Sequence, residues 1–271
     1  MSRIGFIGGG NMAEALIKGL TAANVYLPED IIASDIRVER LEYLRNQFVI
    51  GVNEDNTAVA ESVDVLVLSV KPQNMTDALE SIKDAIKAET LVISIAAGIK
   101  VSKIADALGD VAIVRVMPNT PALIGEGASA LFANDKAKAM LDKAIKIFSA
   151  VGKAVVVEDE GLIDAVTAVS GSGPAYYFLL MEEMIKAAGK LGLPDETAKE
   201  LVLQTAKGAA LLAAERDKQG ETPAQLRKKV TSPGGTTEAA LKVLEGYRVK
   251  EHLVEAIQAA AQRSKELSEG S

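Results

Sequence analysis

The chain has 271 residues, 48% of them hydrophobic, which predicts one or two domains with a sizeable core. Its formal net charge of −7 argues against a nucleic-acid partner, because nucleic-acid-binding proteins usually show a basic footprint. The absence of Cys excludes disulfides and thiolate metal sites, and the single His, His252, argues against a His-based metal site or a Ser-His-Asp triad.

The first part of the chain alternates strand-like and helix-like segments. Strands are predicted over residues 3–8, 30–34, 63–70, 90–96, 111–117, 127–133 and 153–159. The run VDVLVLSV at 63–70 is continuous and branched, as expected of a strand that is buried on both faces. Helical spacing fills the segments between, beginning with 10–23 and 37–47. This alternation predicts βαβ units and an α/β fold with a mostly parallel, doubly wound sheet of Rossmann type.

After about residue 160 the strand signals vanish. Helices are predicted over 161–170, 173–191, 195–217, 223–230, 235–245 and 248–268. The segment GPAYYFLLMEEMI at 173–185 is apolar on more than one face, which favours a subunit interface. We therefore expect a dinucleotide-binding domain over 1–160 and an all-helical substrate and dimerisation domain over 161–271.

The first chemical motif follows the first predicted strand. Residues 8–13 read GGGNMA and match the pattern G-x-G-x-x-G/A at the entry to a predicted helix. The glycines permit a tight turn and let a pyrophosphate approach the backbone amides, and the helix N-terminus adds a favourable dipole. The pattern predicts a dinucleotide site, and the alternative is an ordinary glycine-rich turn between a strand and a helix.

The end of the second predicted strand gives conflicting signals about the choice between NAD and NADP. Asp35 can hold a ribose 2′-hydroxyl. Ser34, Arg37 and Arg40 can surround a 2′-phosphate, although Arg37 can equally be a solvated helix residue. We predict NADPH as the cofactor and leave NADH open.

Three further strand ends carry unusual sequences at 69–73, 96–98 and 117–121. Ligands of such sheets bind beyond the carboxyl ends of the strands. Lys71 directly follows a buried strand, and the small residues at 96–98 allow a nicotinamide ribose to lie against the backbone. Asn119 is placed to reach either the cofactor carboxamide or the substrate.

A second glycine-rich stretch, TSPGGTT, occupies residues 231–237 just before a predicted helix. A Pro-Gly-Gly turn flanked by hydroxyl side chains predicts either a simple helix cap or a site that grips an anion. Physical reasoning alone leaves the anion open between a carboxylate and a phosphate.

Six motifs occur in order along the chain: GFIGGGNM, VLSVKPQ, ISIAAG, RVMPNTPA, AVSGSGPAY and AQLRKKVTSPGGTTEAALKVLE. On these motifs the chain resembles the pyrroline-5-carboxylate reductase family over essentially its whole length. The resemblance implies reduction of 1-pyrroline-5-carboxylate to proline by NAD(P)H, the last step of proline biosynthesis. It also implies a helical domain that interlocks with a partner subunit, so that the active site lies between one subunit's cofactor domain and helices of the dimer interface. A homodimer is expected, with a higher oligomer of dimers left open.

The resemblance also implies site residues, carried over by position. The implied cofactor contacts are Gly8, Gly10, Asn11, Met12, Ser34, Asn56, Ser69, Val70, Lys71, Pro72, Ala96 and Ala97. To these we add Arg37 from the end of the second predicted strand. Asn56 alone looks like a helix cap before Thr57. The implied substrate contacts are Ser232, Gly234, Gly235, Thr236 and Thr237, with Thr237 facing the ring nitrogen.

This chemistry makes modest demands on the protein. Hydride adds to the imine carbon, and the imine nitrogen can take its proton from water, so no strong general acid is required. A Thr hydroxyl both donates and accepts hydrogen bonds, and amides at a helix N-terminus can hold a carboxylate. We predict Thr237 and Ser232 as the catalytic residues: Thr237 hydrogen-bonds the imine nitrogen, and Ser232 binds the carboxylate together with the amides of 234–237. The alternative is that Thr236 or Thr237 merely caps a helix.

Two other functions stay open at this stage. A β-hydroxyacid dehydrogenase shares the two-part layout, but such enzymes usually carry a catalytic Lys in a G-x-x-G-x-G-x-x-x-K context. The equivalent region here, SGSGPAYYFLLMEEM, has no Lys until Lys186. A non-catalytic NADPH-binding regulator is compatible with the dinucleotide motif, but it needs no grip for a carboxylate.

The remaining expectations concern location and partners. No apolar run approaches the roughly 18 residues that a membrane helix needs. The apolar stretch IGFIGGG leads directly into a segment carrying Glu14 and Lys18, unlike a signal peptide. We expect a cytoplasmic protein with a small-molecule substrate, no nucleic-acid or membrane partner, and no metal.

Overall fold

A computed structural model describes residues 2–270 of the chain. The chain forms two compact units, of which the second runs from Ala175 to Gln258. The first unit consists of two segments, one up to Pro174 and the other from Ala259 onward.

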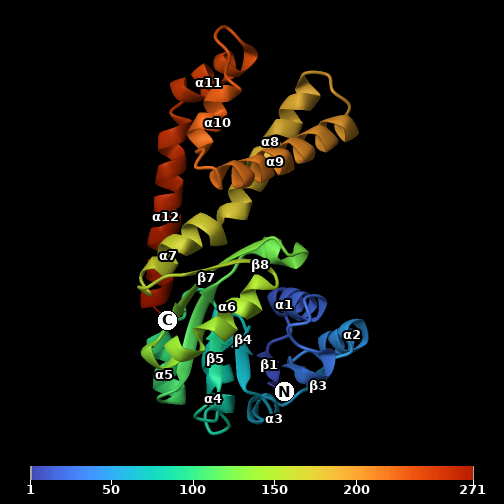
Figure 1. The fold of residues 1–271 in the computed structure, drawn as a ribbon, viewed down its shortest axis with the longest axis vertical. Helices are drawn as coiled ribbons and strands as arrows, with labels where there is room; N and C mark the ends of the chain where they lie inside the picture. Colours follow the sequence, from blue (N-terminus) through green and yellow to red (C-terminus); the bar gives the residue numbers. More distant parts are fainter. Residues whose placement is uncertain (1, 271) are drawn as a thin grey trace. The chain divides into compact units, whose positions relative to one another are not determined.

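In the described part of the first unit, eight strands form one sheet (Figure 1). The strands are β1 (Ile4–Ile7), β2 (Ile31–Ser34), β3 (Gly51–Asn53), β4 (Val65–Leu68), β5 (Leu91–Ser94), β6 (Ala112–Met117), β7 (Gly127–Ala133) and β8 (Gly152–Val156). Their order is β3-β2-β1-β4-β5-β6-β7-β8, and every neighbouring pair is parallel except β6 with β7. The chain winds outward in both directions from β1 and β4, which confirms the predicted doubly wound, mostly parallel sheet.

Helices cover both faces of this sheet. One face carries α1 (Asn11–Ala22), α2 (Val38–Phe48) and α6 (Leu141–Ser149), and the other carries α3 (Asn56–Glu61), α4 (Met75–Ile82) and α5 (Val101–Leu108). In β4, Val65 and Val67 pack into the first layer, whereas Leu66 and Leu68 pack into the second. All four side chains are fully buried, which explains why the sequence of this strand is continuously apolar.

One strand escaped the sequence prediction. β3 is only three residues long, lies at the edge of the sheet, and contains Gly51, which is exposed. Neither alternation nor a continuous apolar run can be recognised over so short a segment. Short 3₁₀ turns complete the first unit at Pro28–Asp30, Pro72–Asn74, Thr120–Ile124 and Asp135–Met140.

The C-terminal region is all-helical, as predicted. It begins with α7 (Leu162–Val166) and a π-helical turn (Thr167–Gly171), followed by α8 (Gly173–Lys190), α9 (Asp195–Asp217), α10 (Pro223–Lys229), α11 (Thr236–Gly246) and α12 (Val249–Glu269). Among the described helices, none combines the length and the apolar character needed to cross a membrane.

The compact units do not divide at the predicted boundary of residue 160. Packing of α7 against β6 and β7 keeps the segment after residue 160 with the sheet. Ser264 near the end of α12 donates a hydrogen bond to Asp164 of α7, with 2.7 Å between the oxygens, and Ser264 is buried. The helical pattern therefore starts near residue 161, but the second compact unit starts only at Ala175.

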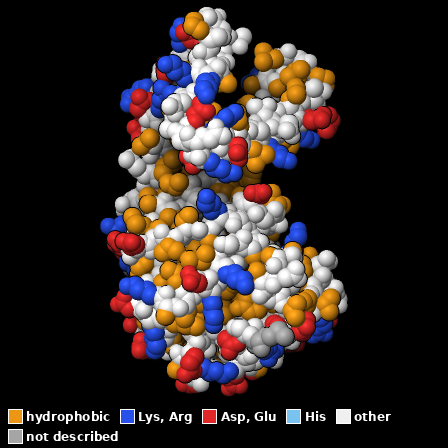
Figure 2. All heavy atoms as spheres, viewed as in Figure 1, with side chains coloured by type: hydrophobic (Ala, Val, Ile, Leu, Met, Phe, Trp, Pro, Cys, Tyr) orange, Lys and Arg blue, Asp and Glu red, His pale blue; other side chains and the backbone are white. Residues whose placement is uncertain are grey.

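The second unit leaves large apolar side chains at its surface (Figure 2). On α8, four consecutive residues, Tyr177, Phe178, Leu179 and Leu180, are 58–65% exposed. Contiguous apolar exposure of this kind marks an interaction surface, as the sequence of 173–185 had indicated.

Candidate functional site

The glycine-rich turn between β1 and α1 is open above the helix N-terminus. Gly8 has φ +96°, and a Cβ added to it would lie 2.9 Å from the Ser69 carbonyl oxygen, so only glycine fits there without strain. Gly10 is the N-cap of α1 and has extended backbone. A Cβ on Gly10 would meet no atom within 4 Å. The space that this missing side chain leaves at the start of α1 suits an anionic group.

Beside this turn the first unit contains a groove of about 580 Å³, called here the β1–β4 groove. It is lined by Ile7, Gly8, Gly10, Asp35, Ile36, Arg37, Asn56, Ser69, Val70, Lys71, Gln73, Asn74, Asp77 and Ala78. Seven of these are predicted cofactor contacts: Gly8, Gly10, Arg37, Asn56, Ser69, Val70 and Lys71. The groove lies where the winding direction of the sheet reverses, which is the usual ligand position in such folds.

Ser69 ties the ends of the two central strands together. Its Oγ lies 2.6 Å from the Gly8 carbonyl oxygen and 3.1 Å from that of Ile7. Its backbone N–H also donates to the Ile7 carbonyl at 2.9 Å. These bonds fix the floor of the groove, so Ser69 supports the glycine turn as well as lining the groove.

At the rim of the groove, Asp35 and Arg37 form an ion pair. The Arg37 Nε lies 3.0 Å from Asp35 Oδ1, and the Gly9 N–H donates to Asp35 Oδ2 at 2.9 Å. Burial raises the pKa of the Asp35 carboxyl, but hydrogen bonds from the Arg37 side chain, the Arg37 backbone and the Gly9 backbone outweigh it and lower the pKa below its usual value. Both oxygens of Asp35 are thus engaged, whereas Arg37 is 60% exposed at the rim.

Arg40 turns inward instead of facing the groove. Its Nε donates to the Gly9 carbonyl, its Nη2 donates to the Gly10 carbonyl at 3.3 Å, and the guanidinium pairs with Glu14 of α1. The prediction that Arg40 surrounds a 2′-phosphate is therefore not supported. Arg40 holds the glycine turn against α1 from behind.

Ser34 is fully buried and does not line the groove. Its hydroxyl donates to Asn56 Oδ1 at 2.6 Å, and Asn56 Nδ2 donates to Ser81 Oγ at 3.1 Å. Ser34 thereby orients Asn56, which lines the groove, and the expected direct contact between Ser34 and the cofactor stays a prediction. The cap of α3 is Asp55, which accepts the Thr57 N–H, so Asn56 is not the helix cap that its position alone suggested.

Five other predicted cofactor contacts also lie outside the lining of the groove: Asn11, Met12, Pro72, Ala96 and Ala97. Met12 packs partly against the core, and Ala96 is buried within it. Just beyond, Gly98 has φ +74°, and a Cβ there would lie 3.4 Å from Leu267 near the end of α12. The loop after β5 is therefore braced by the last turns of the chain.

Asn119 has a structural role. It is 9% exposed, its Nδ2 donates to the Ser170 carbonyl at 3.0 Å, and its Oδ1 accepts the Ala128 N–H at 2.9 Å. The side chain thus joins the end of β6 to β7 and to the π-helical turn. The expected contact with substrate or carboxamide finds no support, because the amide oxygen and one N–H already serve the backbone.

In the second unit, the stretch 231–237 forms a tight turn that enters α11. The Gly235 N–H donates to the Ser232 carbonyl at 3.0 Å, and Gly234 has φ +70°, as in a type II turn with Pro233 at its second position. A Cβ on Gly235 would lie only 2.5 Å from Ser232 Oγ. A side chain at position 235 would therefore displace the Ser232 hydroxyl from its place against the turn.

The amides of this turn differ in availability. The Gly234 N–H donates to Glu238 Oε2 at 3.0 Å, so both glycine amides are used internally. The first α-helical bond of α11 is from the Ala239 N–H to the Gly235 carbonyl. This leaves the Glu238 N–H and, among the predicted contacts, the Thr236 and Thr237 N–H groups without an acceptor in the helix. No side chain caps α11, which argues against a mere capping role for Thr236 or Thr237. The predicted anion grip therefore narrows to these two amides and the Ser232 hydroxyl.

Known families match both parts of the chain. The model of pyrroline-5-carboxylate reductase dimerisation matches residues 160–267, and that of NADP oxidoreductase, coenzyme F420-dependent, matches residues 3–98. A pyrroline-5-carboxylate reductase of Pseudomonas aeruginosa is 49% identical over 269 residues, which cover 98% of this chain and 97% of that protein. The chain belongs to the pyrroline-5-carboxylate reductase family.

Solved structures of pyrroline-5-carboxylate reductases agree with this assignment. The structure of the Coxiella burnetii protein is 43% identical, covers 98% of both chains and superposes with a TM-score of 0.92. A Plasmodium falciparum pyrroline carboxylate reductase with NADP bound is 32% identical at the same coverage, with a TM-score of 0.87. The fold of this chain is therefore that of pyrroline-5-carboxylate reductases along its whole length.

Proposed function

We propose that this chain reduces 1-pyrroline-5-carboxylate to proline with NADPH, holding the substrate carboxylate on the turn at 231–237. The observation that carries the proposal is this turn, in a chain that belongs to the pyrroline-5-carboxylate reductase family along its full length. The free amides at the start of α11 and the Ser232 hydroxyl suit a carboxylate, and the Thr237 hydroxyl suits the ring nitrogen.

The β1–β4 groove fits a dinucleotide. Gly10 leaves room for a pyrophosphate at the start of α1, and Lys71 and Arg37 bring positive charge to the lining. Arg37 is exposed at the rim while Asp35 is already engaged by Gly9 and Arg37, which favours a 2′-phosphate over a bare 2′-hydroxyl. When bound, NADPH supplies the hydride.

The protein binds the substrate at two groups, the imine nitrogen and the carboxylate. Thr237 Oγ1 donates to the neutral imine nitrogen or accepts from the protonated one, and water supplies the proton that the nitrogen retains. The Thr236 and Thr237 amides and the Ser232 hydroxyl hold the carboxylate, which fixes the ring before the imine carbon accepts hydride. No group with a strongly shifted pKa is required for this reaction.

Gly10→Ala is expected to raise the KM for NADPH by about tenfold while the protein folds normally. The backbone of Gly10 suits alanine, and the new methyl group meets no protein atom, so its cost falls on the bound cofactor. Steady-state kinetics and thermal unfolding measure the two effects. Gly8→Ala is the contrasting variant, because its left-handed φ and the Ser69 carbonyl predict a lower Tm. An unchanged KM in Gly10→Ala would contradict the assigned pyrophosphate position.

The second unit supports a homodimer. The matched dimerisation module covers 160–267, and the exposed apolar residues of α8 lie within it. We propose that these side chains are covered by the partner subunit. An oligomer of dimers and a cytoplasmic location stay predictions from the sequence.

The test of the proposed function compares substrates and cofactors. NADPH and NADH oxidation are followed with 1-pyrroline-5-carboxylate and, separately, with a 3-oxoacid. The proposal predicts turnover of the cyclic imine, faster with NADPH, and no appreciable turnover of the oxoacid. Preference for the oxoacid would indicate a β-hydroxyacid dehydrogenase, and NADPH binding without turnover would indicate a regulator.

A further inference from the structure

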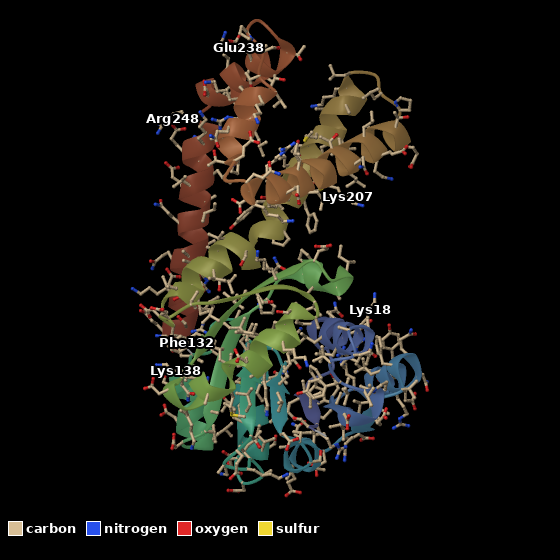
Figure 3. All side chains as sticks on the ribbon, viewed as in Figure 1. Lys18, Phe132, Lys138, Lys207, Glu238 and Arg248 are labelled. Atoms are coloured by element: carbon tan, nitrogen blue, oxygen red, sulfur yellow. The ribbon has the colours of Figure 1, made fainter. Side chains whose placement is uncertain are left out.

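The first turn of α11 carries a carboxylate of its own. Glu238, labelled in Figure 3, places its Oε2 3.0 Å from the Gly234 nitrogen and 3.3 Å from Lys242 Nζ. An acidic residue at the third helical position often reaches back to the amide of the N-cap residue. Here Glu238 reaches one residue further, because the N-cap is Gly235 and its amide already donates to Ser232.

This bond adds a second hydrogen bond within the turn to the one from the Gly235 N–H to the Ser232 carbonyl. Gly234 lies in the left-handed region, and its N–H would point to solvent without the Glu238 carboxylate. The conformation of the turn also determines the position of the Ser232 hydroxyl, which lies against Gly235. A turn that is ordered before the ligand arrives loses less conformational freedom on binding, so the ligand binds more tightly.

The same carboxylate creates an electrostatic conflict. An uncompensated negative charge on Glu238 would repel a substrate carboxylate at the neighbouring amides. Lys242 lies one helical turn later, in the i,i+4 arrangement that favours a Glu–Lys pair. The pair therefore presents a hydrogen-bond acceptor to Gly234 with its charge compensated.

We propose that Glu238 is a positioning residue that fixes the substrate-carboxylate turn through Gly234, and that Lys242 masks its charge from the substrate. The inference rests on the proposed function, since it assumes that the turn binds the carboxylate of 1-pyrroline-5-carboxylate. It adds Glu238 and Lys242 to the residues that determine substrate affinity.

The test uses Glu238→Ala, Glu238→Gln and Lys242→Gln. Glu238→Ala removes the acceptor and is expected to raise the KM for 1-pyrroline-5-carboxylate about tenfold, with the KM for NADPH unchanged. Glu238→Gln keeps an acceptor oxygen and is expected to restore the KM to within about threefold of the original chain. Thermal unfolding of each variant controls for folding. An unchanged substrate KM in Glu238→Ala, or a defect in Glu238→Gln as large as in Glu238→Ala, would overturn the positioning role.

The masking role has its own test. Lys242→Gln is expected to raise the KM for the substrate about threefold at low salt, because Glu238 then repels the carboxylate. In the Glu238→Gln background the same change should have no effect, since no charge is left to mask. An equal effect of Lys242→Gln in both backgrounds would overturn the masking role.

Ser232→Ala separates this inference from the proposed function. If Ser232→Ala raises the substrate KM and Glu238→Ala does not, the turn binds the carboxylate but Glu238 does not position it. If neither change affects the substrate KM, the turn is not the carboxylate site, and both proposals fail together.

Discussion

Thr237→Ala is expected to lower kcat/KM for 1-pyrroline-5-carboxylate about 100-fold, the usual cost of removing one hydrogen-bond donor that acts at the reacting centre. The protein should fold normally, because the Thr237 side chain does not cap α11 and the backbone bonds of the helix are unaffected. Thr237→Ser keeps the hydroxyl and should retain most of the activity. Steady-state kinetics with saturating NADPH measure the change.

Thr236→Ala is the matched control. Thr236 is the same residue type, is adjacent in the same helical turn, is exposed and also makes no capping bond. Its loss should change kcat/KM by no more than about threefold, since only its backbone amide is assigned to the carboxylate. Unchanged kinetics in Thr237→Ala, or equal losses in both variants, would remove the Thr237 hydroxyl from the mechanism.

Glu160→Ala is expected to lower the free energy of unfolding by about 3 kcal/mol, because it leaves a buried charge without its partner. Arg115 in β6 is only 3% exposed, and its Nη1 lies 2.8 Å from Glu160 Oε1. The same oxygen accepts the N–H of Val101 at the start of α5, also at 2.8 Å. Glu160 is 24% exposed, which places the expected loss at the lower end of the range for buried pairs.

Urea unfolding at a fixed protein concentration measures this loss, with concentration fixed because dimerisation contributes to stability. Asp135→Ala is the control, since Asp135 and its partner Lys138 are both well exposed and the free energy of unfolding should not change measurably. A loss in Glu160→Ala no larger than in Asp135→Ala would show that the Arg115–Glu160 pair does not anchor the segment that leads into the helices.

The sequence predicted the strands well wherever burial produces a long apolar run of residues. The runs that became β1 and β4 are continuously apolar because helices cover both of their faces, and those of β5 and β6 are apolar apart from Ser94 and Arg115. β3 left no such pattern, because it is a three-residue edge strand. The predicted boundary at residue 160 follows the change in local pattern, whereas the compact unit depends on the packing of α7 against the sheet.

Within the site, the sequence predicted which backbone positions matter better than which side chains face the ligand. Gly8 and Gly10 were predicted because the tight turn and the close approach of a pyrophosphate to the backbone favour glycine at this spacing. Ser34 and Asp35 both seemed available at the end of β2, yet successive side chains leave a strand on opposite sides. Ser34 is consequently buried and bonds Asn56 of the groove lining, while Asp35 bonds Gly9 at the rim.

The turn at 231–237 likewise shows hydrogen bonds that its sequence motif did not predict. Its residues predicted an anion grip made by the amides of 234–237, but two of those amides already have internal acceptors. No sequence motif states that Glu238 takes the Gly234 amide, because the reach of that side chain depends on where the helix begins. The contacts thereby narrow the predicted anion site to the Ser232 hydroxyl and the Thr236 and Thr237 amides.

The most direct test of the account compares 1-pyrroline-5-carboxylate with 1-pyrroline, the same cyclic imine without the carboxylate. With NADPH in excess, we predict proline formation equal to NADPH consumption and a kcat/KM for the carboxylated ring at least about 100-fold higher, because 1-pyrroline lacks the group that accepts the three hydrogen bonds from the Ser232 hydroxyl and the Thr236 and Thr237 amides. Equal kcat/KM values for the two rings, or no NADPH oxidation with 1-pyrroline-5-carboxylate, would contradict the account.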